Sequence, residues 1–168
     1  STLLASSAAS DVYKRQHVVN FTDIQLYIYD QCPHDELTII MRRYMMRIAE
    51  HFAKESRCLG LITGESIGQV ASQTMQAIGC TEAVVEDLPV FRPLIGMDKD
   101  EVIERARNIG TFETSILPYE DCCTVFTPKH PRTRPHLKQV EEAEAVLDVE
   151  ALVEEAINNI KFLRITGE

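Results

Sequence analysis

The clearest pattern of apolar and polar positions in the chain lies between residues 36 and 54. Apolar side chains recur there every three or four positions, which places them on one face of an α-helix. They are Leu37, Ile40, Met41, Tyr44, Met45, Ile48 and Phe52. Weaker versions of this pattern predict helices over 24–29, over 67–78 ending at Gly79, from Asp98 to Gly110, and over 137–160. Asp98 and Glu101 form a capping-box pair at the start of the helix that ends at Gly110.

Short apolar runs at residues 17–21, 58–62 and 89–95 predict strands that alternate with the helices. This alternation is typical of βαβ units and therefore predicts an α/β fold with a parallel sheet. The periodicity stops between residues 118 and 135, where the chain carries four prolines, the pair Cys122 and Cys123, and a run of basic residues. A loop of this length inside a compact domain is usually functional or disordered.

The segment 63–73, TGESIGQVASQ, joins a predicted strand to a predicted helix. Ser66 is expected to cap that helix, with Gln69 completing a capping box. Gly64 allows backbone conformations that other residues resist, and Gly68 is expected in the first helical turn. In open α/β sheets, ligands bind beyond the carboxyl ends of strands and near helix N-termini. The segment is therefore either a ligand-binding strand–helix turn or an ordinary one, and the pattern alone favours neither interpretation.

Three arginines, Arg42, Arg43 and Arg47, lie on the strongest predicted helix. Arg43 and Arg47 share a face, while Arg42 lies about 100° around the helix from Arg43. Arginine presents a planar fork of donors that suits a phosphate or a carboxylate. The alternative is a basic stripe that faces solvent, and without further information this second interpretation is favoured.

Length and composition indicate one soluble globular domain. The chain has 168 residues, a net charge of -9 and five cysteines without CxxC spacing. The cysteine usage fits a reducing compartment such as the cytoplasm, and no apolar run is long enough to span a membrane. The negative charge argues against strong nucleic-acid binding by this segment alone, so a polyanion would need a local basic patch or another domain. Residues 1–16 are expected to be a disordered leader outside the domain, which is expected to cover 17–165.

The adjacent pair Cys122 and Cys123 is a candidate for a reactive thiol. The thiolate is the reactive form of cysteine, and basic residues follow the pair between positions 129 and 134. The preceding Glu120 and Asp121 act against thiolate formation, because nearby negative charge raises a thiol pKa. Two alternatives are that these cysteines are small buried side chains or metal ligands. Adjacent cysteines have poor spacing for zinc, so no metal site is predicted.

Several strings together resemble one family: FTDIQ, TIIMRRYMMRIAE, TGESIGQVASQT, RPLIGMDKDEVI and IGTFETSILPYEDCCTVFTPKHPRTRP. They closely resemble the C-terminal ATP-pyrophosphatase domain of the tRNA 4-thiouridine sulfurtransferases, also called thiamine biosynthesis sulfurtransferases. The resemblance implies a Rossmann-like adenine nucleotide α-hydrolase fold with a parallel sheet. It also implies an enzyme that uses ATP and Mg²⁺ to adenylate a uridine in tRNA. A persulfide sulfur from a cysteine desulfurase then replaces the activated oxygen, and the same sulfur can feed thiazole synthesis for thiamine.

By position in these strings, Arg42, Gly64 and Gln73 are expected to contact the nucleotide. Cys123, just before the TVF stretch, is expected to handle sulfur, with the adjacent Cys122 as the alternative. The basic run from Lys129 to Arg134 contacts tRNA phosphates or is simply a solvated loop, and neither interpretation is favoured.

The family's pyrophosphate-binding loop, a serine-glycine-glycine motif, does not occur in this sequence and is expected upstream of it. The resemblance therefore implies an N-terminally truncated domain, with tRNA held mainly by domains absent here. The parent protein is expected to be the enzyme, and these residues alone to be inactive in ATP–pyrophosphate exchange. The alternatives are a non-catalytic nucleotide-binding fragment, or a related tRNA thiolase that acts at another uridine.

Overall fold

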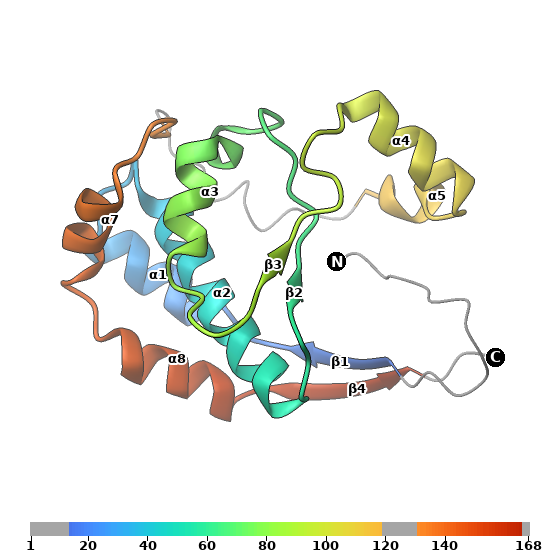
Figure 1. Ribbon diagram of the computed structural model, residues 1–168. Helices are drawn as coiled ribbons and strands as arrows, with labels where there is room; N and C mark the ends of the chain where they lie inside the picture. The colour runs from blue at the N-terminus through green and yellow to red at the C-terminus, as the bar shows by residue number, and fades with distance from the viewer. Residues whose placement is uncertain (1–13, 119–130, 166–168) are drawn as a thin grey trace.

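A computed structural model describes residues 14–118 and 131–165 of the chain. Figure 1 shows one long central helix with several helices around it, other helices set apart at the upper right, and two pairs of strands. The elements in chain order are β1 (Lys14–Val18), α1 (Thr22–Gln31), α2 (Leu37–Glu55), β2 (Leu61–Ile62), the 3-10 turn η1 (Ala71–Gln73), α3 (Met75–Glu82), β3 (Val90–Phe91), α4 (Lys99–Asn108), α5 (Phe112–Ser115), α7 (Leu137–Glu144), α8 (Val149–Asn158) and β4 (Lys161–Ile165). None of the helices within these described ranges is both long and apolar enough to cross a membrane.

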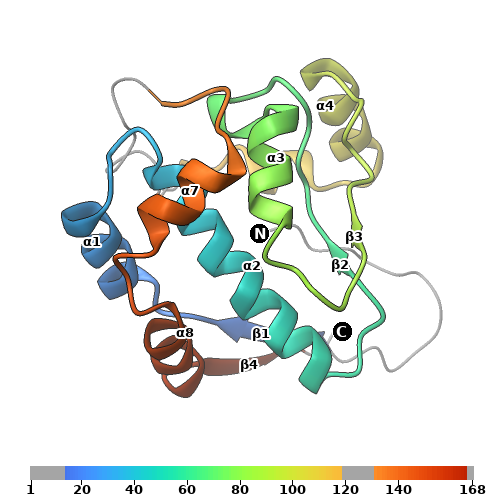
Figure 2. The same ribbon diagram turned by 60° about the vertical axis from the view of Figure 1, so that its left-hand side comes forward.

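Helix α2 is the centre of the hydrophobic core, and the helix predicted over 36–54 is confirmed. Helices α1, α3, α7 and α8 lie around α2, as Figure 2 shows. Ile40 and Tyr44 on α2 are fully buried, together with Ile28 of α1 and Val140 of α7. One predicted core position is wrong, because Met45 is 41% exposed. The core is thus built on one amphipathic helix whose apolar face other helices cover.

The strands form two separate pairs of opposite type. β2 and β3 are parallel, with Leu61 opposite Val90, and α3 lies between them in the chain, so the predicted βαβ unit is confirmed. β1 and β4 are antiparallel, with His17 opposite Phe162, and no strand was predicted for the C-terminal partner. The first strand runs over Lys14–Val18 and not over 17–21, so it begins inside the segment expected to be a leader. Residues 1–13 lie outside the described residues.

The helix predicted over 137–160 is wrong, because two helices, α7 and α8, occupy this region. The chain between α7 and α8 is not helical, and α8 begins after Asp148. The Asp148 side chain caps α8 by accepting a hydrogen bond from the Ala151 backbone N–H at 3.1 Å. The capping box at the start of α4 is confirmed. The Asp98 side chain accepts from the Glu101 N–H at 2.9 Å, and the Glu101 side chain accepts from the Asp98 N–H at 2.8 Å. Gly110 follows this helix with a φ of +71°.

The predicted start of the helix over 67–78, with Ser66 as its cap, is also wrong. The chain between 63 and 70 is a loop, η1 follows it, and α3 begins only at Met75. Thr74 caps α3 by accepting a hydrogen bond from the Ala77 N–H at 3.2 Å. Gly79, the predicted end of the helix, lies inside α3. The Ser66 hydroxyl instead donates to the Met97 carbonyl at 2.6 Å, so its preferred partner comes from a distant part of the chain.

Candidate functional site

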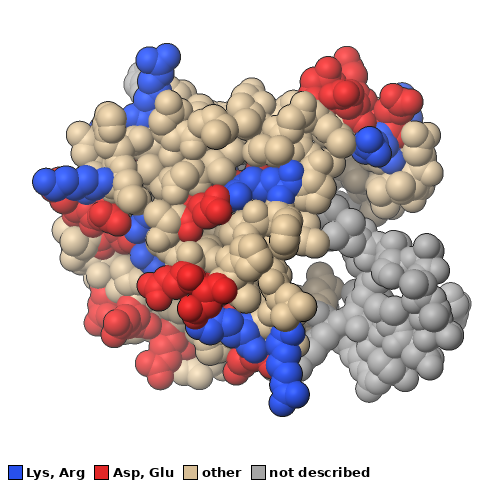
Figure 3. All heavy atoms as spheres, in the orientation of Figure 1, with Lys and Arg blue, Asp and Glu red and all other residues tan. Residues whose placement is uncertain are grey.

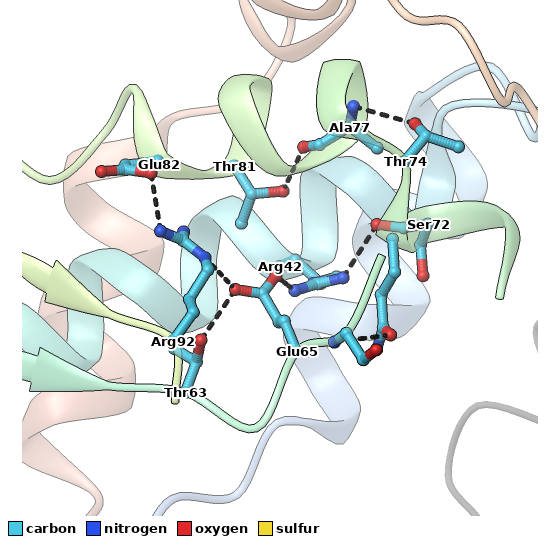
Figure 4. A network of polar contacts seen from close by, with 11 residues as sticks. Arg42, Thr63, Glu65, Ser72, Thr74, Ala77, Thr81, Glu82 and Arg92 are labelled. Atoms are coloured by element: carbon cyan, nitrogen blue, oxygen red, sulfur yellow. Dashed lines mark hydrogen bonds and ion pairs between the residues drawn. The ribbon is translucent and has the colours of Figure 1, made fainter. Parts of the chain in front are cut away.

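Charged side chains gather where the two parallel strands end. The chain leaves β2 through Thr63 and leaves β3 through Arg92. Both strands run in the same direction, so these exits lie at the same edge of the sheet, and the Thr63 N–H donates to the Phe91 carbonyl at 3.0 Å. Figure 4 shows the side chains that meet there from α2, α3 and the two loops. The carboxyl ends of parallel strands are the usual place for a ligand in such sheets.

Glu65 is the central acceptor of this cluster and is only 5% exposed. Its Oε2 accepts from the Thr63 hydroxyl at 2.8 Å and from Arg92 Nε at 2.7 Å. Its Oε1 forms an ion pair with Arg42 Nη2. A buried carboxylate is retained as an anion only when it is paired and hydrogen-bonded, and Glu65 meets both conditions.

Arg42 reaches this cluster from α2 and joins both ends of the 63–73 segment. Its Nη1 donates to the Ser72 carbonyl at 2.9 Å, while its Nη2 faces Glu65. The Arg42 side chain is 20% exposed, so part of it still faces solvent. The structure therefore brings Arg42 next to the segment that contains the other two expected nucleotide contacts.

Gln73 closes the segment onto itself. Its side-chain Oε1 accepts from the Ser66 N–H at 3.3 Å, and its carbonyl accepts from the Gly68 N–H at 3.0 Å. Gly68 has a φ of +80°, which favours glycine and makes this tight turn possible. Gly64 is exposed between Thr63 and Glu65 and does not have a positive φ. The left-handed backbone conformation that glycine permits therefore occurs in this segment at Gly68 and not at Gly64.

Arg92 and Glu65 are the two members of the site that the sequence patterns did not single out. Besides Glu65, Arg92 contacts Glu82 at the end of α3, with Nη1 at 2.8 Å from Oε2. Its Nη2 is buried and has no hydrogen-bond partner among the described residues. Arg92 directly follows β3, and Glu65 lies three residues after the end of β2. A charged residue close to the end of each strand, within RPLIG and TGES, was therefore the available signal. The site thus holds two guanidinium groups against one buried carboxylate, with the partly exposed Glu82 at its edge.

The residues of this site do not fit a resident metal ion. Within the described ranges, 14–118 and 131–165, no three His, Cys, Asp or Glu side chains come close enough together to hold one. The one buried carboxylate at the strand ends already pairs with arginines. The donors of the site instead suit a ligand with polar or anionic acceptor atoms.

The other two arginines of α2 have a different role. Arg43 is 3% exposed, and its Nε and Nη2 donate to Glu144 of α7 at 3.1 and 3.0 Å. Arg47 donates to both oxygens of the same carboxylate at 2.6 and 2.8 Å. Burial raises the pKa of Glu144, but the hydrogen bonds and charges of Arg47 and Arg43 outweigh burial and hold that pKa below its usual value. The favoured interpretation of a solvent-facing basic stripe is therefore wrong, because these arginines join α2 to α7.

Cys122 and Cys123 lie outside the described residues. The chain that follows them is described again from residue 131, where Arg132 pairs with Asp35 at 2.6 Å and Glu36 at 2.8 Å. Thr74 connects this part of the chain to the candidate site, because its hydroxyl donates to the Thr133 carbonyl at 2.7 Å. Arg132 of the basic run thus binds carboxylates of the chain itself. On the face in Figure 3, the Lys and Arg side chains of the described residues are scattered among acidic ones and form no single basic patch.

Comparisons with known proteins agree on one family. The family model described as thiamine biosynthesis protein (ThiI) matches residues 2–149. A probable tRNA sulfurtransferase of Lachnoclostridium phytofermentans is 62% identical over 151 residues, which cover 89% of this chain and 38% of that protein. One from Agathobacter rectalis is 59% identical over 154 residues, covering 90% of this chain and 39% of that protein.

The fold has a solved counterpart, a 4-thiouridine synthetase crystallised in complex with RNA and with bound ATP. It matches this chain with a TM-score of 0.85 and 44% identity, over 90% of this chain and 39% of the solved one. The predicted Rossmann-like α/β class is thereby confirmed. The chain spans 39% or less of the length of these relatives.

Proposed function

This chain belongs to the thiamine biosynthesis protein (ThiI) family, and we propose that the full-length protein is an ATP-dependent tRNA sulfurtransferase that makes 4-thiouridine. The curated relatives are named for this transfer, and the solved relative holds ATP and RNA. Because the chain spans 39% of those proteins, we assign the reaction to the whole protein and nucleotide binding to the part described above. The proposed place of action is the cytoplasm, and the family also links the sulfur to thiamine synthesis.

The observation that carries the proposal is the meeting of Arg42 with the 63–73 segment at the carboxyl ends of two parallel strands. In this proposal Arg42, Gly64 and Gln73 contact ATP. Arg42 supplies charged donors that suit the acceptor atoms of a nucleotide. Gly64 is exposed beside the end of β2 and has no side chain, which leaves room there for the adenosine part. Gln73 shapes the turn that carries the Ser72 carbonyl.

The chemistry follows from the need for a leaving group. A uridine oxygen attacks the α-phosphorus of ATP and pyrophosphate leaves. The outer sulfur of a persulfide, supplied by a cysteine desulfurase, then attacks the carbon that carries the activated oxygen, and that oxygen leaves with AMP. A second thiol attacks the inner sulfur, which breaks the S–S bond, leaves one sulfur on the uridine and forms a disulfide that an external thiol reduces. Cys123 is the proposed sulfur-handling residue, with Cys122 as the alternative, since a thiolate is the reactive form. In this proposal Mg²⁺ enters as part of the Mg–ATP substrate. Domains beyond this chain hold most of the tRNA, in keeping with the net charge of -9.

The test measures ATP affinity and tRNA thiolation separately in the full-length protein. Arg42→Ala and Gln73→Ala are expected to weaken ATP binding by about tenfold, the loss of one good polar contact. Lys138→Ala, whose side chain on α7 is 87% exposed, is the matched control and should bind ATP as the wild type does. Cys123→Ser should abolish 4-thiouridine formation, measured by mass spectrometry of tRNA nucleosides, and spare ATP binding.

Each alternative has its own outcome. Thiolation that persists in Cys123→Ser but is lost in Cys122→Ser moves the sulfur-handling role to Cys122. A thiolated product at another uridine identifies a different tRNA thiolase. ATP binding by the wild type without any thiolation of tRNA, given an active cysteine desulfurase and cysteine, refutes the enzymatic proposal in favour of a nucleotide-binding role alone.

A further inference from the structure

We propose that Glu65 is a positioning residue of the nucleotide site, which holds the Arg42 guanidinium in the orientation that meets ATP. The inference rests on the proposed function, since it concerns how the expected ATP contact is kept in place. Glu65 itself touches arginines and Thr63, so it acts on the nucleotide only through its neighbours.

The two oxygens of Glu65 have separate partners. Oε2 accepts from Thr63 and Arg92, which fixes the carboxylate against the ends of β2 and β3. Oε1 faces Arg42, and no other donor among the described residues reaches it. Oε2 therefore fixes the carboxylate at the strand ends, while Oε1 pairs with Arg42.

The contacts of Arg42 fix the plane of its guanidinium. One terminal nitrogen faces Glu65 and the other donates to the Ser72 carbonyl at 2.9 Å. The guanidinium is rigid and planar, so two anchors on different terminal nitrogens set both its position and its tilt. These anchors precede and follow the turn at Gly68, so the orientation of Arg42 depends on the shape of the whole 63–73 segment.

Charge explains why a carboxylate is needed at this position. Arg42 and Arg92 both approach Glu65, and their side chains are 20% and 10% exposed. Without the negative charge, two guanidinium groups would face each other with little water between them, and like charges at close range repel. Arg42 is the more exposed of the two and is therefore expected to move away first. Its guanidinium N–H groups would then no longer point at the bound ATP.

A double-mutant cycle on ATP affinity separates positioning from simple structural support. In the full-length protein, Glu65→Gln is expected to weaken ATP binding by about fivefold to tenfold, through the loss of one well-placed charged contact. In the Arg42→Ala background, the same Glu65→Gln change is expected to have no further effect on the dissociation constant for ATP. Such non-additivity is expected when one residue acts through the other.

The matched control is Glu144→Gln, which alters another buried carboxylate that pairs with two arginines of α2, away from the strand ends. It is expected to lower the Tm while leaving ATP affinity within about twofold of the wild type. If Glu65→Gln does not fold, Thr63→Val serves instead, since it removes the 2.8 Å hydrogen bond to Glu65 and keeps every charge. Its loss of ATP affinity should be smaller, and should also vanish in the Arg42→Ala background.

The outcomes distinguish the two proposals. If the wild type fails to bind ATP, the proposed function is wrong. If ATP binds but Arg42→Ala has no effect, the nucleotide contact is misassigned and the role of Glu65 falls with it. If Arg42→Ala weakens binding but the effect of Glu65→Gln is additive to it, or equals that of Glu144→Gln, only the positioning role is refuted.

Discussion

Glu144 is predicted to contribute more to the stability of this domain than any exposed carboxylate. Its side chain and that of Arg43 are 5% and 3% exposed, and four hydrogen bonds of 2.6 to 3.1 Å join it to Arg43 and Arg47. Glu144→Ala would remove two of the hydrogen bonds of the buried Arg43 and keep the one to the Cys80 carbonyl at 2.7 Å. Removing one partner of a buried ion pair typically costs about 3–5 kcal/mol, so a loss of this size is expected.

Urea unfolding of the chain at pH 7, followed by circular dichroism, measures this loss. Glu142→Ala on the same helix is the control, because its 67% exposed side chain only approaches Lys138 at 3.9 Å. An exposed pair of this kind contributes about 0–1 kcal/mol. A Glu144→Ala loss no larger than that of Glu142→Ala would refute the claim that α7 is held to α2 by this buried cluster.

The pH dependence of the Glu144 contribution is a second measurement on the same variant. Because the folded-state pKa lies below the ordinary value of 4.5, folding favours the charged carboxylate. The contribution is therefore fully present above the unfolded-state pKa and is lost as the pH falls through the lowered folded-state pKa. The difference in unfolding free energy between wild type and Glu144→Ala should be constant near neutral pH and should shrink in acid.

Gly60→Ala is expected to destabilise the β2–β3 pair by about 1–3 kcal/mol, since an added Cβ would lie 2.9 Å from the Phe91 ring. Gly79→Ala inside α3, where an added Cβ meets nothing within 4 Å, should raise stability by about 1 kcal/mol, and calorimetric Tm values check both. Glu50→Ala removes a carboxylate that accepts from three consecutive backbone N–H groups at 2.8 to 3.2 Å, so a loss of about 2–3 kcal/mol and faster hydrogen exchange of those amides are expected. Thr74→Val removes the cap of α3 and the hydrogen bond to the 131–135 region, which should cost about 1 kcal/mol and speed limited proteolysis there. Unchanged hydrogen exchange or proteolysis in the last two variants would contradict these roles.

Local signals in the sequence predicted the elements that depend on neighbouring residues. The apolar repeat over 36–54 gave α2, and the Asp98–Glu101 pair gave the start of α4, because both depend on side chains within a turn of each other. Ser66 carries the same kind of capping signal and does not cap a helix. Its hydroxyl instead bonds to Met97, 31 residues away, and no pattern within one turn contains that information.

The residues of the candidate site also fall into those that the sequence indicates and those that only tertiary contacts identify. Motif resemblance selected Arg42, Gly64 and Gln73, since each lies in a long string that can be matched in order. Glu65 lies within one of those strings, but no sequence pattern marks it, because its role depends on contacts with Arg42 and Arg92. The roles of Cys122 and Cys123 remain predictions from the sequence.

The sequence by itself determined the family, the α/β class and the residues expected to meet a nucleotide, because these depend on the order and identity of residues along the chain. The tertiary structure alone decided what each arginine of α2 does. Arg42 turns to the 63–73 segment, while Arg43 and Arg47 bind a carboxylate about 100 positions further along. The physical reason is that a guanidinium is stable in a partly buried place only beside a carboxylate or carbonyl, and folding brings those partners from distant parts of the chain.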